Sequence, residues 1–335
     1  MKKIISILCV CAFTSSVFSQ KKVALQSGGI AKFYSGTNPL ISAYNAAVSG
    51  DTIYLPGGVY EAPTTIDKSL VIYGTGHYVD STLTTGKTII SNNISLGDNA
   101  DNSYFEGIDF TGPVTLTNNV SVDHITIKRC KIGGSFYANG ALTKPCANLT
   151  LCENVFLGNI YIENTVNVLI SNSIIKGYIS DSHENNISNN IFLYNASSTM
   201  RPLSSSSNNQ VYNNIFINQN ISSGSGNIFT NNLIVSASPY YGTSATVLNS
   251  YINVPQANIF VNQTGVDFNY SHNYHLKTPE LYVGTDNTEV GIYGGIFPYK
   301  EGAVPSNPHI QFKNIAPKTN INGELLIQIQ VEAQD

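Results

Sequence analysis

The sequence predicts an all-β protein whose short strands coil into a parallel β-solenoid. Three observations support this fold class. Segments of about 20 residues repeat through the middle of the chain, each repeat holds large apolar residues at two fixed positions, and asparagine is concentrated beside these apolar positions. A helical repeat would need about 34 residues or more, so the period indicates coils of short strands.

Each repeat is defined by an anchor residue that follows an alternating apolar pair. Successive anchors lie 17 to 24 residues apart. In all eight repeats a large apolar residue stands two places before the anchor and another stands three places after it. We therefore expect both columns, from Phe105 to Val247 and from Phe110 to Ile252, to face one continuous core. The anchors are Gly107, Arg129, Glu153, Asn172, Asn189, Asn213, Asn231 and Asn249.

The asparagines are expected at the corners of the coils. The stretch ENNISNNIFLYN (184–195) contains five of them among aliphatic residues. Asparagine tolerates the left-handed conformation that sharp corners use, and stacked copies can pass hydrogen bonds from coil to coil. We assign this ladder to the column directly after the anchors, because the anchor column contains Arg129 and Glu153, which are costly to bury. The predicted ladder residues are Asn154, Asn190, Asn214 and Asn232.

Both ends of a solenoid need covering, because they expose the core and unpaired strand edges. Residues 37–49 carry apolar residues at helical spacing, so a capping helix is expected within an N-terminal cap at 36–50. After Pro298 the pattern changes, and 309–315 and 324–334 alternate apolar and polar residues. We expect two strands there, which either cover the last coil or form a β-tail at 301–335, after a β-helix domain at 20–300.

The first nineteen residues have the features of a signal peptide. Lys2 and Lys3 precede an apolar stretch, and a cleavage site is expected before Gln20. We therefore expect an exported protein, extracellular or in the cell envelope. No later segment is long and apolar enough for a transmembrane helix. The formal net charge is −4 and Arg129 and Arg201 are the two arginines, so a nucleic-acid footprint is not expected.

Three cysteines follow the expected cleavage site: Cys130, Cys146 and Cys152. Metal binding is not expected, because they show no metal-ligand spacing. We expect them to be buried as small apolar residues, and the alternative is one local disulfide with one cysteine left over.

Two further stretches carry a family resemblance. AAVSGDTIYLPGGVYEAPTTIDKSLVIYGTG (46–76) is similar to the first coils of many secreted β-helices, and NYHLKTPELYVGTDNTEVGIYGGIFPY (273–299) is similar to their last coil. The chain, over roughly residues 36 to 300, resembles the right-handed parallel β-helix proteins of the pectate-lyase-like superfamily. That superfamily includes lyases, hydrolases, adhesins and proteins of unknown role, so the resemblance implies the fold and not one activity.

The resemblance implies what an enzyme would need here. Lyases of this kind need Lys or Arg as a base, with Ca²⁺ at the substrate carboxylate, and hydrolases need paired carboxylic acids. Lys128, Arg129 and Asp123 are the catalytic candidates, in the charged region between anchors 107 and 153. The preferred interpretation is structural, because adjacent coils would pair Glu106 with Lys128, Asp109 with Lys131, and Arg129 with Glu153. No cofactor is expected unless the lyase alternative holds.

Two other groups are weighed against simpler roles. Asp181, His183 and Glu184 could hold a cation or serve as acid and base, but we expect a solvated turn. Tyr137 and Tyr161 both fall eight places after their anchors, one above the other. Such rings can stack on sugars, although ordinary strand tyrosines fit the same pattern.

Two functions remain as leading hypotheses. The first is a non-catalytic protein that presents a rigid hydroxyl- and amide-rich surface to a polysaccharide, a cell-surface glycan or a partner. The second is a polysaccharide lyase or other carbohydrate-active enzyme acting at the early coils. An adhesin or structural spike that associates through its ends is a third reading.

Overall fold

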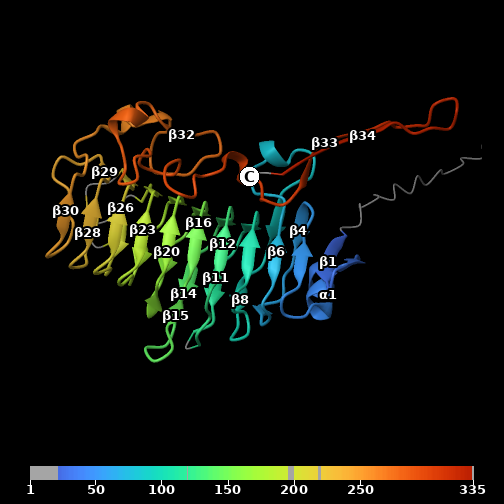
Figure 1. Ribbon diagram of the computed structural model, residues 1–335, viewed down its shortest axis with the longest axis horizontal. Coiled ribbons are helices and arrows are strands. Elements are labelled where there is room, and N and C mark those ends of the chain that lie inside the picture. Colours follow the sequence, from blue (N-terminus) through green and yellow to red (C-terminus); the bar gives the residue numbers. More distant parts are fainter. Residues whose placement is uncertain (1–21, 119, 195–199, 218–219, 334–335) are drawn as a thin grey trace, which may run out of the picture.

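The computed structural model describes residues 22–118, 120–194, 200–217 and 220–333. It confirms the predicted parallel β-helix (Figure 1). Three sheets run along the solenoid, and up to residue 204 the chain passes from sheet A to sheet B to sheet C in each coil. In the two later coils, strands are formed in sheets A and B. Strands of successive coils pair in parallel in every sheet, so each coil stacks on the one before it. The expected signal peptide, residues 1–19, lies outside the described residues.

Sheet A has twelve strands and begins with an antiparallel hairpin. Its strands are, in order, β2 (Ile30–Tyr34), β1 (Val23–Ser27), β3 (Thr52–Tyr54), β6 (Val71–Tyr73), β9 (Tyr104–Glu106), β12 (Thr126–Lys128), β16 (Thr150–Cys152), β20 (Leu169–Ser171), β23 (Asn186–Ser188), β26 (Gln210–Tyr212), β28 (Ile228–Thr230) and β30 (Thr246–Leu248).

Sheets B and C have nine and seven strands. Sheet B consists of β4 (Gly58–Tyr60), β7 (Thr88–Ile90), β10 (Asp109–Phe110), β13 (Lys131–Ile132), β17 (Val155–Phe156), β21 (Ile174–Ile175), β24 (Ile191–Phe192), β27 (Ile215–Phe216) and β29 (Leu233–Ile234). Sheet C consists of β5 (Thr65–Ile66), β8 (Ile94–Leu96), β11 (Val114–Leu116), β14 (Phe136–Ala138), β18 (Ile160–Tyr161), β22 (Ile179–Ser180) and β25 (Leu203–Ser204). A short parallel pair, β15 (Cys146–Ala147) and β19 (Thr165–Val166), lies outside the three sheets.

The two apolar columns face the core in the first seven repeats. All members from Phe105 to Phe229 and from Phe110 to Ile234 are buried. The prediction was wrong for the eighth repeat, where Val247 is 40% and Ile252 48% exposed. The reason is that β30 is the terminal strand of sheet A, so no further coil covers these side chains.

The anchors form the sharp corner between sheets A and B. All eight have a positive φ, between 48° and 71°. The four asparagines predicted to form a ladder directly follow their anchors and are fully buried. Asn190 donates from Nδ2 to Oδ1 of Asn214 at 3.0 Å, and Asn214 donates in the same way to Asn232 at 3.1 Å. Their remaining Nδ2 bonds go to backbone oxygens inside the coil, such as Ile170 O and Ile187 O.

A second corner, between sheets C and A, repeats this chemistry. A residue with positive φ is again followed by a buried asparagine in three successive coils, and the backbone N–H of Asn185 donates to Asn209 Oδ1 at 3.0 Å. Asn209 in turn donates to Asn227 Oδ1 from its side chain, also at 3.0 Å. Sequence reasoning assigned one column of buried asparagines, whereas the described residues contain two.

The N-terminal end carries the expected capping helix, α1 (Pro39–Ala46). Leu40, Ala43 and Ala47 bury their side chains in the core. Pro39 suits the first turn, where its missing N–H would have no partner. Beside the helix, the β1–β2 hairpin adds to the edge of β3 in antiparallel fashion. Within the described residues, no helix has the length and apolar character needed to cross a membrane.

After the last coil, residues 254–306 fold back along the outside of the solenoid (Figure 1, orange to red). This covering segment contains η2 (Gln256–Asn258), β31 (Phe260–Asn262) paired with β32 (Asn273–Leu276), η3 (Pro279–Leu281) and η4 (Glu301–Ala303). It forms a second apolar core with the outer face of sheet B. That face contributes Val155, Ile174, Ile191, Ile215 and Leu233, and the segment contributes Phe260, Tyr274, Leu276, Val290, Ile292 and Tyr299.

The two predicted C-terminal strands are β33 (His309–Ile315) and β34 (Ile327–Glu332), which pair in antiparallel fashion. They do not cover the last coil. They form a tail that projects from the molecule beside the first coils (Figure 1, red). Thr84 there donates its hydroxyl to Gln311 O at 2.8 Å.

Asn214 gives a direct test of the corner hydrogen bonds. Asn214→Ala should lower the free energy of unfolding by about 3 kcal/mol, because several buried groups lose a partner at about 1–3 kcal/mol each. Asn186→Ala, on the outer face of sheet A, is the matched control and should stay within about 0.5 kcal/mol of the parent. Urea unfolding followed by circular dichroism measures both, and equal losses would contradict the assignment.

The cysteines Cys130, Cys146 and Cys152 are free and buried. Burial raises the pKa of Cys152 to about 12, so its reactive thiolate is scarce at neutral pH. In the chain starting at Gln20, a thiol reagent should react slowly from about pH 7 to 9 and should titrate three thiols after denaturation without reductant. One thiol in the denatured chain would mean that a disulfide forms instead.

Candidate glycan-binding site

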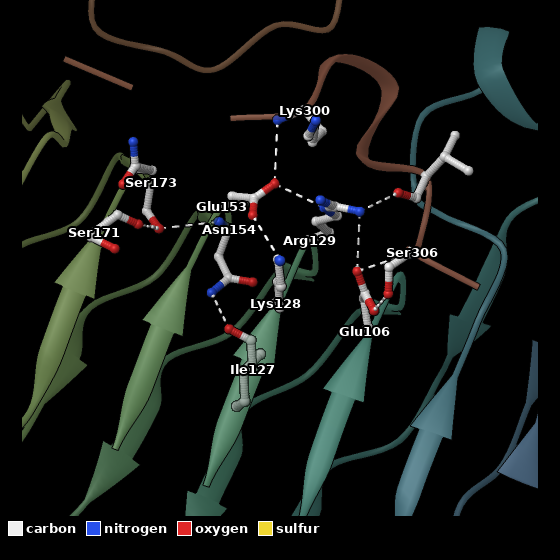
Figure 2. Close-up of polar contacts among 12 residues, drawn as sticks. Glu106, Ile127, Lys128, Arg129, Glu153, Asn154, Ser171, Ser173, Lys300 and Ser306 are labelled. Carbon is white, nitrogen blue, oxygen red and sulfur yellow. Dashed lines mark hydrogen bonds and ion pairs between the residues drawn. The ribbon is translucent and has the colours of Figure 1, made fainter. Parts of the chain in front are cut away.

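The charged residues of the early coils form a buried ion cluster at the corner between sheets A and B (Figure 2). Arg129 lies between two carboxylates: its Nε is 2.8 Å from Glu153 Oε2 and its Nη1 is 3.3 Å from Glu106 Oε1. The side chains of these three residues are at most 3% exposed. Lys128, which is 20% exposed, contacts the other oxygen of Glu153 at 3.2 Å.

Two of the three expected pairs are present. Arg129 pairs with Glu153, and Lys131 Nζ lies 2.9 Å from Asp109 Oδ2. The expected pairing of Glu106 with Lys128 was wrong, although the two residues are register neighbours on β9 and β12. Lys128 reaches forward to the next coil, while Glu106 is held by Arg129, by the Tyr104 hydroxyl and by Ser306.

The covering segment explains how charged anchors can be buried. Arg129 donates to Val304 O at 3.1 Å, the backbone N–H of Lys300 donates to Glu153, and Ser306 donates to Glu106 from both its backbone and its hydroxyl (Figure 2). The expectation that the anchor column would stay unburied was therefore wrong. Each charge is compensated by an ion pair and by hydrogen bonds, which is the condition for burying it.

The same docking continues along the asparagine anchors. Asn172 donates to Ile292 O and Gly294 O, Asn189 to Gly291 O, and Asn231 to Val283 O. Asn213 accepts a bond from Thr285 N at 2.9 Å. As the anchor number rises, the partner number falls, so the covering segment runs antiparallel to the stack of coils.

The catalytic candidates do not converge on one point. Lys128 and Arg129 lie at the corner between sheets A and B, and their charges are paired. Asp123 lies at the opposite end of β12, at the corner between sheets C and A, where it accepts bonds from Ser121 Oγ and Ala147 N. A catalytic base and acid must both reach the same substrate atoms, and this placement separates them.

The candidate cation ligands belong to a turn. Asp181 and Glu184 both have positive φ, so they serve as corner residues, and Asp181 accepts a bond from Ser180. His183 and Glu184 are exposed. Among the described residues, no group of three or more His, Cys, Asp or Glu is arranged to hold a metal ion.

Tyr137 and Tyr161 are stacked on the outer face of sheet C, with ring centroids 4.9 Å apart and planes 3° apart. The Tyr161 hydroxyl contacts the Tyr178 hydroxyl at 2.9 Å and accepts a bond from Asn159. Tyr178 meets Tyr161 edge-on, and Tyr194 meets Tyr178 in the same way. Burial is the main cause that raises the pKa of Tyr178, and the bond with the Tyr161 hydroxyl is the second. The Tyr178 hydroxyl therefore stays protonated at neutral pH.

Sequence reasoning missed Tyr178 and Tyr194 because they stand outside the strand column. Tyr178 directly precedes β22, and Tyr194 follows β24 by two residues. The available signal was an aromatic residue five to eight places after the anchor in four successive coils. In the resulting cluster, Tyr161 is enclosed by neighbours. Tyr137 lies at the end of the cluster. On the side away from Tyr161, its neighbour in the same column is Thr115.

Tyr137 and Tyr161 also belong to a continuous row of hydroxyl groups. The outward positions of sheet C are in register from β5 to β25, and every member of the row is serine, threonine or tyrosine. The first five are exposed or half-buried, and the last two are buried. The row consists of Thr65, Ser95, Thr115, Tyr137, Tyr161, Ser180 and Ser204.

Comparison with known proteins gives a structural likeness without a family. No family model matches the chain, and no curated protein matches it. Among solved structures it is similar to a tailspike protein, gp49, of Acinetobacter baumannii bacteriophage Fri1, which is described as a capsular polysaccharide depolymerase. The identity is 11% and the TM-score 0.29, over 64% of this chain and 59% of that chain. A likeness at this level does not extend to activity or ligand.

Arg129 tests whether the ion cluster is structural. Arg129→Met should lower the free energy of unfolding by about 3–5 kcal/mol, because it leaves two buried carboxylates without their shared partner. Lys128→Met should cost at most about 1 kcal/mol, since Lys128 is partly exposed and Arg129 still pairs Glu153. Urea unfolding of both variants decides the point. A loss for Arg129→Met no larger than that for Lys128→Met would refute the structural role.

Proposed function

We propose that this protein is an exported, non-catalytic β-helix protein whose sheet C face binds a glycan chain lying along the solenoid. The observation that carries the proposal is the row of hydroxyl side chains on seven successive coils. Strands of successive coils repeat at about 4.8 Å, a spacing close to the length of one sugar residue in an extended polysaccharide. Each hydroxyl can both donate and accept, so one row can serve successive sugar hydroxyls.

The accessible part of this row defines the ligand class. Five of the seven hydroxyl residues are not buried, and none of the seven is charged. A surface of this kind favours sugar hydroxyl groups over carboxylate or sulfate groups, which would require cations. Tyr137 adds a ring at the middle of the row, where an apolar sugar face can pack.

The state of the charged residues supports binding without turnover. Lys128, Arg129, Glu106 and Glu153 are paired with one another at the corner between sheets A and B, away from the row. A glycosidase needs two carboxyl groups that flank the scissile bond, and the hydroxyl row contains no acidic residue. The alternative, a polysaccharide lyase or other carbohydrate-active enzyme at the early coils, would require Lys128 or Arg129 to leave these pairs.

A glycan array combined with an activity screen tests the proposal. The protein should bind one or more neutral glycans, and Tyr137→Ala should weaken binding about tenfold, the equivalent of about 1.4 kcal/mol. Tyr54→Ala is the matched control, because Tyr54 also stacks on a neighbouring tyrosine, Tyr73, but on sheet A. Unsaturated products and reducing ends should stay at background with and without Ca²⁺.

Two results would reject the proposal. If the folded protein binds none of the glycans, glycans are not its ligands. Product formation that Lys128→Ala abolishes would establish the lyase alternative instead.

A further inference from the structure

A cleft of about 280 Å³ lies on the outer face of sheet A, beneath two loops of the covering segment. Its floor comes from three successive strands, β20, β23 and β26, which contribute Leu169, Ser171, Ser188 and Tyr212. Its walls are residues 285–286 on one side and 295–297 on the other. The cleft is therefore built jointly by the coils and the covering segment, on a different sheet from the hydroxyl row.

The floor contains a buried polar group without a partner. Ser171 lines the cleft and is 3% exposed, yet its hydroxyl makes no hydrogen bond with any residue that the structure describes. The backbone oxygen of the same residue is occupied by Ser173 (Figure 2). Buried polar atoms are almost always paired, because an unpaired one loses its hydration without compensation. A ligand hydroxyl in the cleft would supply the missing partner.

The remaining lining combines polar and apolar groups. Asp286 is exposed at the rim and uses Oδ1 to hold the N–H and the hydroxyl of Thr288. Ser188 and Tyr212 add hydroxyl groups to the floor, and Phe297 adds an aromatic ring to one wall. Sugars present this same combination, since their ring has apolar C–H faces and its edge carries hydroxyl groups.

The charges restrict which sugar fits. Among the described residues that line the cleft, Asp286 is the one that carries a charge. Lys128 Nζ lies 5.8 Å from the ring centre of Phe297, but its charge is paired with Glu153. A carboxylate accepts hydrogen bonds from neutral hydroxyls and repels a uronate. A single carboxyl group also falls short of the pair that glycoside hydrolysis needs.

We propose that this cleft binds one neutral sugar residue. Ser171 and Asp286 hydrogen-bond to its hydroxyl groups, and the ring of Phe297 packs against its apolar face. The site is independent of the sheet C row, so either site can exist without the other.

Saturation-transfer NMR on the full chain tests the site, with glucose, galactose, mannose, N-acetylglucosamine and glucuronate as probes. At least one neutral sugar should bind, and glucuronate should bind more weakly than glucose. Ser171→Ala and Asp286→Asn should each weaken binding at least about fivefold. Ser171→Ala should leave the melting temperature unchanged or higher, because it removes an unpaired buried hydroxyl.

Two matched controls locate the effect. Thr126→Ala removes a half-buried hydroxyl from the outer face of the same sheet, on β12, outside the cleft. Asp267→Asn removes an exposed carboxylate of the covering segment that pairs with Lys176. Both, and Tyr137→Ala, should leave sugar binding at the cleft unchanged.

Three outcomes would overturn the proposal. The first is no saturation transfer to any neutral probe. The second is binding that both Ser171→Ala and Asp286→Asn leave intact, which would place the sugar elsewhere. The third is tighter binding of glucuronate than of glucose, which would exclude a neutral ligand. Asp286 is exposed, so its variant remains informative even if a change at Ser171 disturbs the fold.

Discussion

The left-handed residue at the corner between sheets A and B is the constraint on which the rest of the structure depends. Every anchor takes this conformation, which costs an L-residue roughly 1–2 kcal/mol. The tight bend directs the next side chain inward, where Asn190 and its stacked equivalents hydrogen-bond across coils. It leaves the anchor side chain outside, where Asn172 and its equivalents hold the covering segment. One backbone bend thus organises an inner and an outer line of hydrogen bonds.

The buried ion cluster extends this outer line into the early coils. In place of amides, Arg129 and Glu153 make the contacts to the covering segment, and Glu106 joins them from the end of β9. Removing one member would leave the others charged in a poorly hydrated site, so the group acts as a unit. Charged groups of these kinds also occur in active sites, but here their hydrogen bonds hold residues 300–306 against the coils.

The sequence could predict what local periodicity encodes and little of what depends on distant contacts. The repeat, the two apolar columns, α1 and the tail strands all follow from spacing within a few dozen residues. The path of residues 254–306 does not, because bonds such as Asn172 to Ile292 and Glu106 to Ser306 join residues far apart in the chain. Burial of the anchors and the cleft at Ser171 depend on that path. The second column of buried asparagines could have been predicted from the sequence, since each member stands four places before an anchor.

The covering segment also changes how this solenoid can come apart. In a simple solenoid each coil contacts only its neighbours, so an end can fray without disturbing the middle. Here one stretch of chain contacts the coils of Glu106, Arg129, Glu153, Asn172, Asn189, Asn213 and Asn231 in turn. Unfolding of the last coils would therefore also disturb the covering segment, which contacts the early coils as well. The coils are therefore connected through the covering segment as well as through their neighbours. Loss of that segment would destabilise coils that do not contact one another.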